Sequence, residues 1–173
     1  MSRDGNDGKL LAALRAQDPA VARPLWRRFA VRTARVLRRI MGPGARIDDI
    51  VPVVFLCVFE RGARARANAN LDELVLKVTA RVAGVELRRR MARATPRSPR
   101  DPMTRFYRLL DRLSAADRVA FVFHHVENMD VRTVAAAIDG TVVATRRRLR
   151  RAVQTIRAGI ARDPLLRTLG DSP

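Results

Sequence analysis

Several residue types that support disulfide, membrane or secretory chemistry are scarce in this sequence. Its 173 residues include one cysteine, Cys57, so the chain cannot form an internal disulfide. The longest nearly unbroken apolar run spans residues 50–59, whereas a membrane-spanning helix needs about 20 residues. The N-terminus is polar and contains acids, unlike a signal peptide. We therefore expect a soluble cytoplasmic protein with no membrane insertion.

Residue patterns for catalysis and cofactor binding are also absent. The sequence has no glycine-rich phosphate loop, no nucleophile triad, and no carboxylate pair suited to acid–base chemistry. Its two histidines, His124 and His125, are adjacent, so on a helix they point to different sides and cannot easily share a metal ion. We expect a protein that is not an enzyme and that has no catalytic residue, metal or cofactor.

The most abundant charged residue is arginine. The chain has 35 basic and 17 acidic residues, a net charge of +18, and Lys9 and Lys77 are its only lysines. A strong positive charge favours a polyanionic partner, in the first place nucleic acid. The alternative is that the arginine-rich helix faces are solvated surfaces of a chain with an arginine-biased composition.

Apolar residues recur at helical spacing along most of the chain, which predicts an all-α fold. We expect two small helical domains, residues 8–94 and 106–163, joined by a Pro/Arg-rich linker at 95–105. In the first domain the sequence predicts a helix over residues 48–60, capped by Asp48 or Asp49, and another over 71–94.

The second domain has the pattern of a helix-turn-helix. A short helix is predicted at residues 131–138, a tight turn at 139–141 in which Gly140 permits positive φ, and a longer helix at 142–160. Thr141 is placed to cap the longer helix, and its hydroxyl can also reach a phosphate. From Thr141 to Ala161 the sequence has six arginines and no acid. This concentration points to DNA more specifically than the overall charge does.

Motifs along both domains carry a family resemblance. Residues 113–152 read LSAADRVAFVFHHVENMDVRTVAAAIDGTVVATRRRLRRA, and the first domain contains LWRRF, a glycine turn, IDDIV, VFLCVFE and VELRRR in that order. These segments resemble regions 4 and 2 of the extracytoplasmic-function (ECF) sigma factors of bacterial RNA polymerase. The resemblance implies a protein that binds core polymerase and promoter DNA, and that is held inactive by an anti-sigma factor.

The resemblance also implies three sets of contact residues. In the family, the second helix of the helix-turn-helix binds the −35 promoter element, and region 2 melts the −10 element and grips the β′ clamp of the polymerase. The matching residues are Thr141, Val142, Arg146, Arg147, Arg148, Arg150 and Arg151 for the −35 element, Asn68, Asn70, Arg81, Arg88, Arg89, Arg90 and Arg93 for the −10 element, and Asp48, Asp49, Pro52 and Val53 for the polymerase.

Each set has a plausible chemistry. Guanidinium groups such as those of Arg146 and Arg150 can bond guanine O6 and N7 together. The arginines of residues 81–93 are predicted to form one basic helix face along the melted strand. The amides of Asn68 and Asn70 suit the edge of a flipped base.

Departures from the family pattern cluster in the first domain. Pro52-Val53 stands where the family commonly has Gln-Glu, so a polar polymerase contact becomes apolar. Leu74, Arg81 and Val85 stand where tryptophan, asparagine and aspartate are usual.

Three functional interpretations therefore remain. The first is an ECF-type sigma factor that directs promoter-specific initiation. The second is a sigma-derived helix-turn-helix regulator that no longer engages core polymerase normally. The third is a nonspecific binder of polyanions, which would show no sequence preference.

Overall fold

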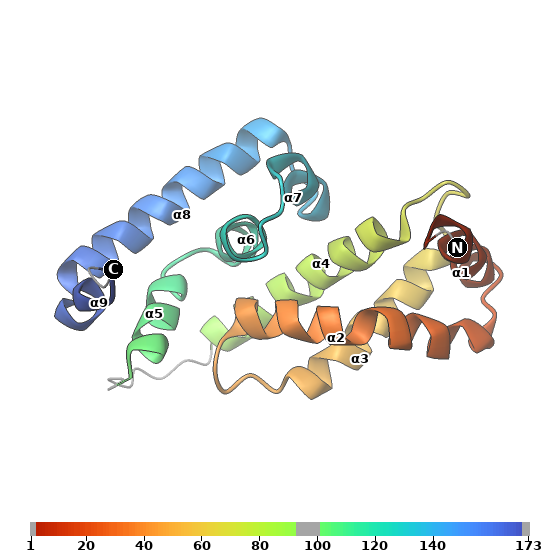
Figure 1. The fold of residues 1–173 in the computed structure, drawn as a ribbon, viewed down its shortest axis with the longest axis horizontal. Helices are drawn as coiled ribbons and strands as arrows, with labels where there is room; N and C mark the ends of the chain where they lie inside the picture. The colour runs from red at the N-terminus through yellow and green to blue at the C-terminus, as the bar shows by residue number, and fades with distance from the viewer. Residues whose placement is uncertain (1–2, 93–100, 171–173) are drawn as a thin grey trace.

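The computed structural model describes residues 3–92 and 101–170 of the chain, and within them every regular element is helical. This confirms the expected all-α fold (Figure 1). The helices before the gap are α1 (Arg3–Arg15), η1 (Pro19–Val21), α2 (Ala22–Met41), α3 (Ile47–Gly62) and α4 (Leu71–Met91). Those after it are α5 (Pro102–Leu110), α6 (Ala115–Phe121), η2 (Val122–Val126, a π-helical turn), α7 (Val131–Ala137), α8 (Val142–Arg162) and α9 (Pro164–Gly170). None of the helices in these residues is long and apolar enough to cross a membrane.

The first half is built on α2, α3 and α4, which contact one another pairwise. Each helix turns an apolar stripe inward, and fully buried side chains such as Leu37, Val54 and Val78 fill the space between them. α1 packs on the C-terminal end of α3. A Cβ on Gly62 would lie 2.9 Å from the Leu14 side chain, so this contact requires a glycine.

The start of α3 differs from the predicted one. The helix begins at Ile47 and has no side-chain cap, so Asp48 and Asp49 lie in its first turn instead of capping it. There they face the positive end of the helix dipole, which stabilises acids without a capping hydrogen bond. Pro52 is the sixth helical residue and donates no hydrogen bond to the carbonyl of Asp48.

The predicted linker at 95–105 is too long at its C-terminal end. Helix α5 begins at Pro102, because Asp101 caps it by accepting hydrogen bonds from the amide (2.8 Å) and hydroxyl (2.9 Å) of Thr104. These bonds hold the pKa of Asp101 below its ordinary value. Proline in a first helical turn loses no hydrogen bond, so Pro102 initiates the helix and does not mark a linker. Residues 93–100 lie outside the described residues.

The two halves pack directly against each other, although the sequence suggested two domains on a tether. Helix α4 contacts α6 and α7, and α6 lies between α4 and α8 (Figure 1). The buried side chains of both halves form one continuous cluster.

A buried guanidinium joins the halves at the C-terminal end of α2. The side chain of Arg118 on α6 is 2% exposed. Its Nε donates to the carbonyl of Ile40 (2.6 Å) and its Nη2 to that of Met41 (3.2 Å), and Nη1 pairs with Asp111. Burial lowers the pKa of Arg118 from its ordinary value, but arginine stays charged at neutral pH.

Further side chains cap the same helix end. Arg90 donates to the carbonyl of Met41 (3.1 Å), and the hydroxyl of Tyr107 donates to the carbonyls of Arg38 (3.4 Å) and Arg39 (3.3 Å). Gly42, with φ of 77°, lies against the Tyr107 ring, and a Cβ there would come within 2.4 Å of it.

Replacing the buried guanidinium tests its role in joining the halves. Arg118→Met leaves the carbonyl of Ile40 without its side-chain donor and that of Met41 with Arg90 alone, so the free energy of unfolding is expected to fall by about 3 kcal/mol in urea titrations. The same variant should also be digested faster by a nonspecific protease. Arg112→Met, a change at an exposed neighbouring arginine, is the control. Equal stability of the two variants would contradict this role.

Candidate nucleic-acid interface

Helix α8 combines a buried apolar side with an exposed arginine side. Leu149, Ala152 and Ile156 are buried against α5 and α6. The Thr141 hydroxyl accepts from the amide of Ala144 (3.2 Å), so the predicted cap is confirmed. The exposed side carries Arg146, Arg147, Arg150, Arg151 and Arg157.

The turn before α8 has the predicted position but a different backbone. Asp130 caps α7 by accepting from the amides of Arg132 and Thr133. The positive φ of the turn falls on Asp139 (55°), and not on Gly140 as predicted. Aspartate tolerates this conformation better than most residues. The Asp139 carboxylate also pairs with Lys77 of α4, which ties the turn to the first half.

Two of the predicted DNA-binding arginines are held inside the domain. The nearly buried carboxylate of Asp117, in the first turn of α6, accepts from Arg148 (3.1 Å) and Arg151 (3.3 Å). In the described residues no ion pair engages the side chains of Arg146, Arg147 or Arg150. These three are therefore the cations most available to a phosphate or a base edge.

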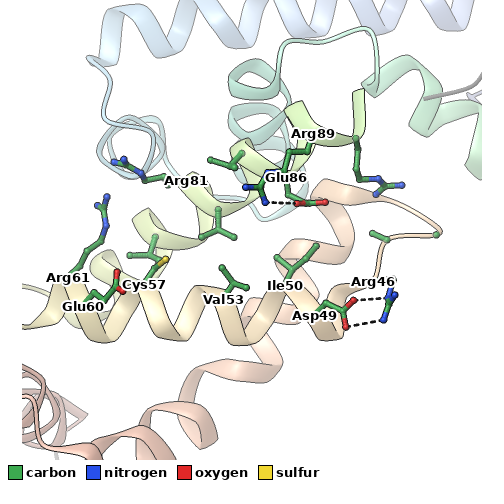
Figure 2. A pocket seen from close by; sticks show the side chains of 16 residues that line it. Arg46, Asp49, Ile50, Val53, Cys57, Glu60, Arg61, Arg81, Glu86 and Arg89 are labelled. Carbon is green, nitrogen blue, oxygen red and sulfur yellow. Dashed lines mark hydrogen bonds and ion pairs between the residues drawn. The ribbon is translucent and has the colours of Figure 1, made fainter. Parts of the chain in front are cut away.

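The predicted −10 residues do not form a single face. Arg81 borders both the groove between α3 and α4 (Figure 2) and the cleft between α4 and α6, whereas Arg89 borders only the groove and Arg88 only the cleft. Arg90 turns toward the carbonyl of Met41. Four residues spread over two turns of a helix point in several directions, which the sequence argument overlooked. Arg93 lies outside the described residues.

The two asparagines have different surroundings. Asn70 caps α4, its side-chain oxygen accepting from the amide of Glu73 (3.0 Å). The Asn-x-x-Glu spacing of a capping box was the signal for this role. Asn68 is exposed in the loop before it.

The predicted polymerase-binding residues lie together on the N-terminal half of α3. Asp48, Asp49, Pro52 and Val53 are all exposed. Arg46 pairs with Asp49 across 2.7 Å. One turn further on, Leu56 is also exposed and extends the apolar part of this surface. The sequence analysis did not single out Leu56, because the apolar run around it is equally consistent with burial.

A sigma-70 region 4 family profile matches residues 103–156, from α5 into α8. This segment, 54 of the 173 residues, is similar to region 4 of the sigma-70 family. The fold of the chain is shared by the solved structure of CnrH in complex with the cytosolic domain of CnrY. That match has a TM-score of 0.68 and 20% sequence identity, and it covers 91% of this chain and 98% of CnrH. CnrH is an ECF sigma factor, the class indicated by the motifs. No curated protein sequence matches the chain.

Side chains that could bind a metal ion do not gather in the part of the chain that the structure describes. In residues 3–92 and 101–170, no three His, Cys, Asp or Glu side chains come together in a group suited to a metal. His124 instead bonds the carbonyl of Met129 through Nδ1 (2.7 Å).

The carboxylate of Asp117 holds two arginines of α8, so replacing it should change the affinity for DNA measurably. In Asp117→Asn, Arg148 and Arg151 are released to contact phosphates, so affinity for duplex DNA of any sequence should rise. The slope of log K against log salt should steepen by about 1 to 2. Fluorescence anisotropy over a salt series measures both. Glu73→Gln removes one exposed acid that forms no ion pair with a described residue, without freeing these arginines. If both variants change the affinity and the salt slope equally, Asp117 affects DNA binding only through the net charge of the protein.

Proposed function

We propose that the chain is an ECF-type sigma factor that directs promoter-specific initiation by binding core RNA polymerase and promoter DNA. The observation that carries the proposal is the helix-turn-helix within residues 103–156, in which Arg146, Arg147 and Arg150 of α8 are exposed and form no ion pair with a described residue. In this function α8 enters the major groove of the −35 element, and Arg146, Arg147 and Arg150 contact base edges or nearby phosphates. The protein needs no catalytic group of its own, because the polymerase supplies the chemistry. It would act in the cytoplasm, at the nucleoid.

The first half supplies the remaining contacts. Asp48, Asp49, Pro52 and Val53 contact the β′ clamp. Arg81, Arg88 and Arg89 contact the backbone of the melted −10 strand, with Asn68 near a flipped base. Asn70 and Arg90 already have partners within the protein. Their part is to hold α4 and the end of α2 in place.

Binding both promoter elements requires the two halves to separate. The elements lie about 25 base pairs apart, which is about 85 Å along B-DNA. A compact chain of 173 residues has a radius of gyration of about 16 Å. The packed arrangement in Figure 1 is therefore the resting state in this proposal, and it opens on promoter DNA.

An anti-sigma factor is the natural inhibitor in this scheme. CnrH was solved with the cytosolic domain of CnrY. We infer that a protein partner likewise stabilises the inactive form of this chain.

A second candidate function is favoured by the apolar surface of α3. Pro52, Val53 and Leu56 are exposed where a polar polymerase contact is usual. A sigma-derived regulator would retain sequence-specific DNA binding and use this surface for a protein other than core polymerase.

Base reading by α8 can be tested on a site selected from a random pool of duplexes. If Arg146 reads a base, Arg146→Ala should cost about 1–3 kcal/mol on that site and relax preference at one position. Arg157→Ala, on the exposed C-terminal part of the same helix, should lower affinity for all sequences alike. If Arg146→Ala lowers the affinity for selected and scrambled duplexes equally, Arg146 contacts a phosphate and does not read a base.

Polymerase binding separates the two candidate functions. At a salt concentration that suppresses nonspecific attraction, a sigma factor should co-elute stoichiometrically with core polymerase on gel filtration. Asp49→Arg should abolish co-elution, because it reverses the charge within the proposed contact. Glu73→Arg makes the same reversal on α4 away from that surface and should have no effect. If the folded wild-type protein binds DNA but fails to co-elute, the regulator is the better description.

A further inference from the structure

Helix α2 is strongly basic, and the proposed function leaves its exposed side without a role. The helix contains seven arginines and no acid. Its apolar side, which includes Leu25, Phe29 and Leu37, is buried in the core of the first half, where α2 contacts α3 and α4. The arginines therefore lie on the outer part of the helix, where they meet either solvent or acids of neighbouring segments.

Three of these arginines are paired within the protein. The pairs are Arg28 with Asp7 and Asp72, Arg32 with Asp72, and Arg39 with Glu127. The other four arginines are exposed and form no ion pair with a described residue. We call these four the α2 stripe: Arg23, Arg27, Arg35 and Arg38. Their charge is available to a ligand from outside the protein.

The α2 stripe forms one continuous side of the helix. At 3.6 residues per turn, its four positions fall within about 120° of the helix circumference. The fifteen-residue step from Arg23 to Arg38 corresponds to about 22 Å along the helix axis. Val31, which lies among the four arginines, is 73% exposed. The stripe therefore faces solvent along most of its length.

The positive charge is least compensated in the middle of the stripe. At its C-terminal end, Arg38 borders a hollow that Asp48 and Asp49 also line. Arg27 and Arg35 lie further along α2, on either side of Val31. These two arginines are therefore the members of the stripe from which an anionic ligand gains most.

The geometry of the stripe suits the phosphate backbone of a nucleic-acid duplex. Duplex DNA carries one negative charge per about 1.7 Å of its axis, so a 22 Å length presents about 13 charges. A guanidinium can bond two phosphate oxygens at once. Because the stripe follows one straight helix, a rod-shaped polyanion can contact it along its whole length. Contacts of this kind position a duplex and do not read its bases.

Other anionic ligands suit the stripe less well. Single strands bind where bases stack on aromatic rings beside a basic track, but the ring of Trp26, at the edge of the stripe, already packs on Phe55 with 5.0 Å between centroids. A helix that lies on a membrane inserts its apolar face into the bilayer. The apolar face of α2 is instead buried in the protein core.

We propose that the α2 stripe is a second binding surface for duplex nucleic acid, separate from the helix-turn-helix. The contacts from α2 to α8 run through α4 and α6, so the two basic helices are distinct surfaces. The stripe holds the phosphate backbone and adds affinity for every sequence alike. This inference goes beyond the proposed function, which assigns contacts to α3, α4 and α8, and it does not depend on polymerase binding.

Neutralising the middle of the stripe tests the proposal on a short duplex of scrambled sequence. Arg27→Gln/Arg35→Gln should lower the slope of log K against log salt by about 2, because two phosphate contacts are lost. At low salt the affinity should fall by about tenfold or more. The control, Arg112→Gln/Arg167→Gln, removes two exposed charges outside the stripe and should change the slope little. Equal changes in both variants would reduce the effect to net charge and overturn the proposal.

A cross-linker within the stripe provides a readout of position. Cys57→Ser removes the only cysteine, and Val31→Cys then accepts a benzophenone maleimide. This label should cross-link to the duplex at least about fivefold more than the same label at Met103→Cys, an exposed site on α5. Equal yields from the two sites would reject the stripe as a binding surface.

The helix-turn-helix must also be separated from this signal. In a background in which Arg146, Arg147 and Arg150 are replaced by glutamine, the cross-link from Val31→Cys should persist. Adding Arg27→Gln/Arg35→Gln to this background should then remove it. If neutralising α8 alone removes the cross-link, α2 lies near DNA only because α8 binds it, and the proposal is wrong.

Competitors identify the source of the phosphates. Duplex DNA and duplex RNA share the backbone chemistry, and the one that suppresses the cross-link at the lower concentration is the ligand. Stronger suppression by single-stranded DNA, phosphatidylglycerol vesicles or polyglutamate at equal charge would overturn the proposal. Failure of the proposed function is distinct. A cross-link without co-elution of polymerase supports the stripe, whereas co-elution without a cross-link supports the sigma function and rejects the stripe.

Discussion

The C-terminal end of α2 is the point on which the packing of the two halves depends. A helix ends with carbonyl groups that have no intrahelical donor and that carry the negative end of the helix dipole. Here the carbonyls of Ile40 and Met41 are met by the buried guanidinium of Arg118. Without these donors, burying the helix end would leave polar groups unsatisfied. Helix α6, and with it the helix-turn-helix, is thus fixed to the first half by a polar contact at the edge of an apolar core.

This arrangement determines which surfaces remain available. Helices α3 and α8 lie on opposite sides of the molecule, with α4 and α6 between them (Figure 1). The arginines of α8 and the groove beside α3 therefore face solvent at the same time. The cleft between α4 and α6, which Arg88 borders, is the part that opening would change most.

Local sequence patterns predicted much of the fold. Apolar periodicity located the principal helices, and the cap at Thr141 was predicted correctly because it depends on a residue only three positions away. The predictions that were wrong also concern residues next to each other in the sequence. Pro102 was taken as part of the linker although Asp101 caps the helix that it begins. The left-handed residue of the turn is Asp139 and not the neighbouring glycine.

The sequence by itself determined the helices and the arginine-rich strip of α8, because both depend on the spacing of residues close together in the chain. Only the tertiary structure decided which arginines remain available. Arg148 and Arg151 are held by an acid more than thirty positions away, and Arg118 and Arg90 bond carbonyls across the chain. It also placed α3 beside α4 so that scattered valines line one groove. The packing of segments that are far apart in the sequence determines these partners, and the spacing of apolar residues does not predict them.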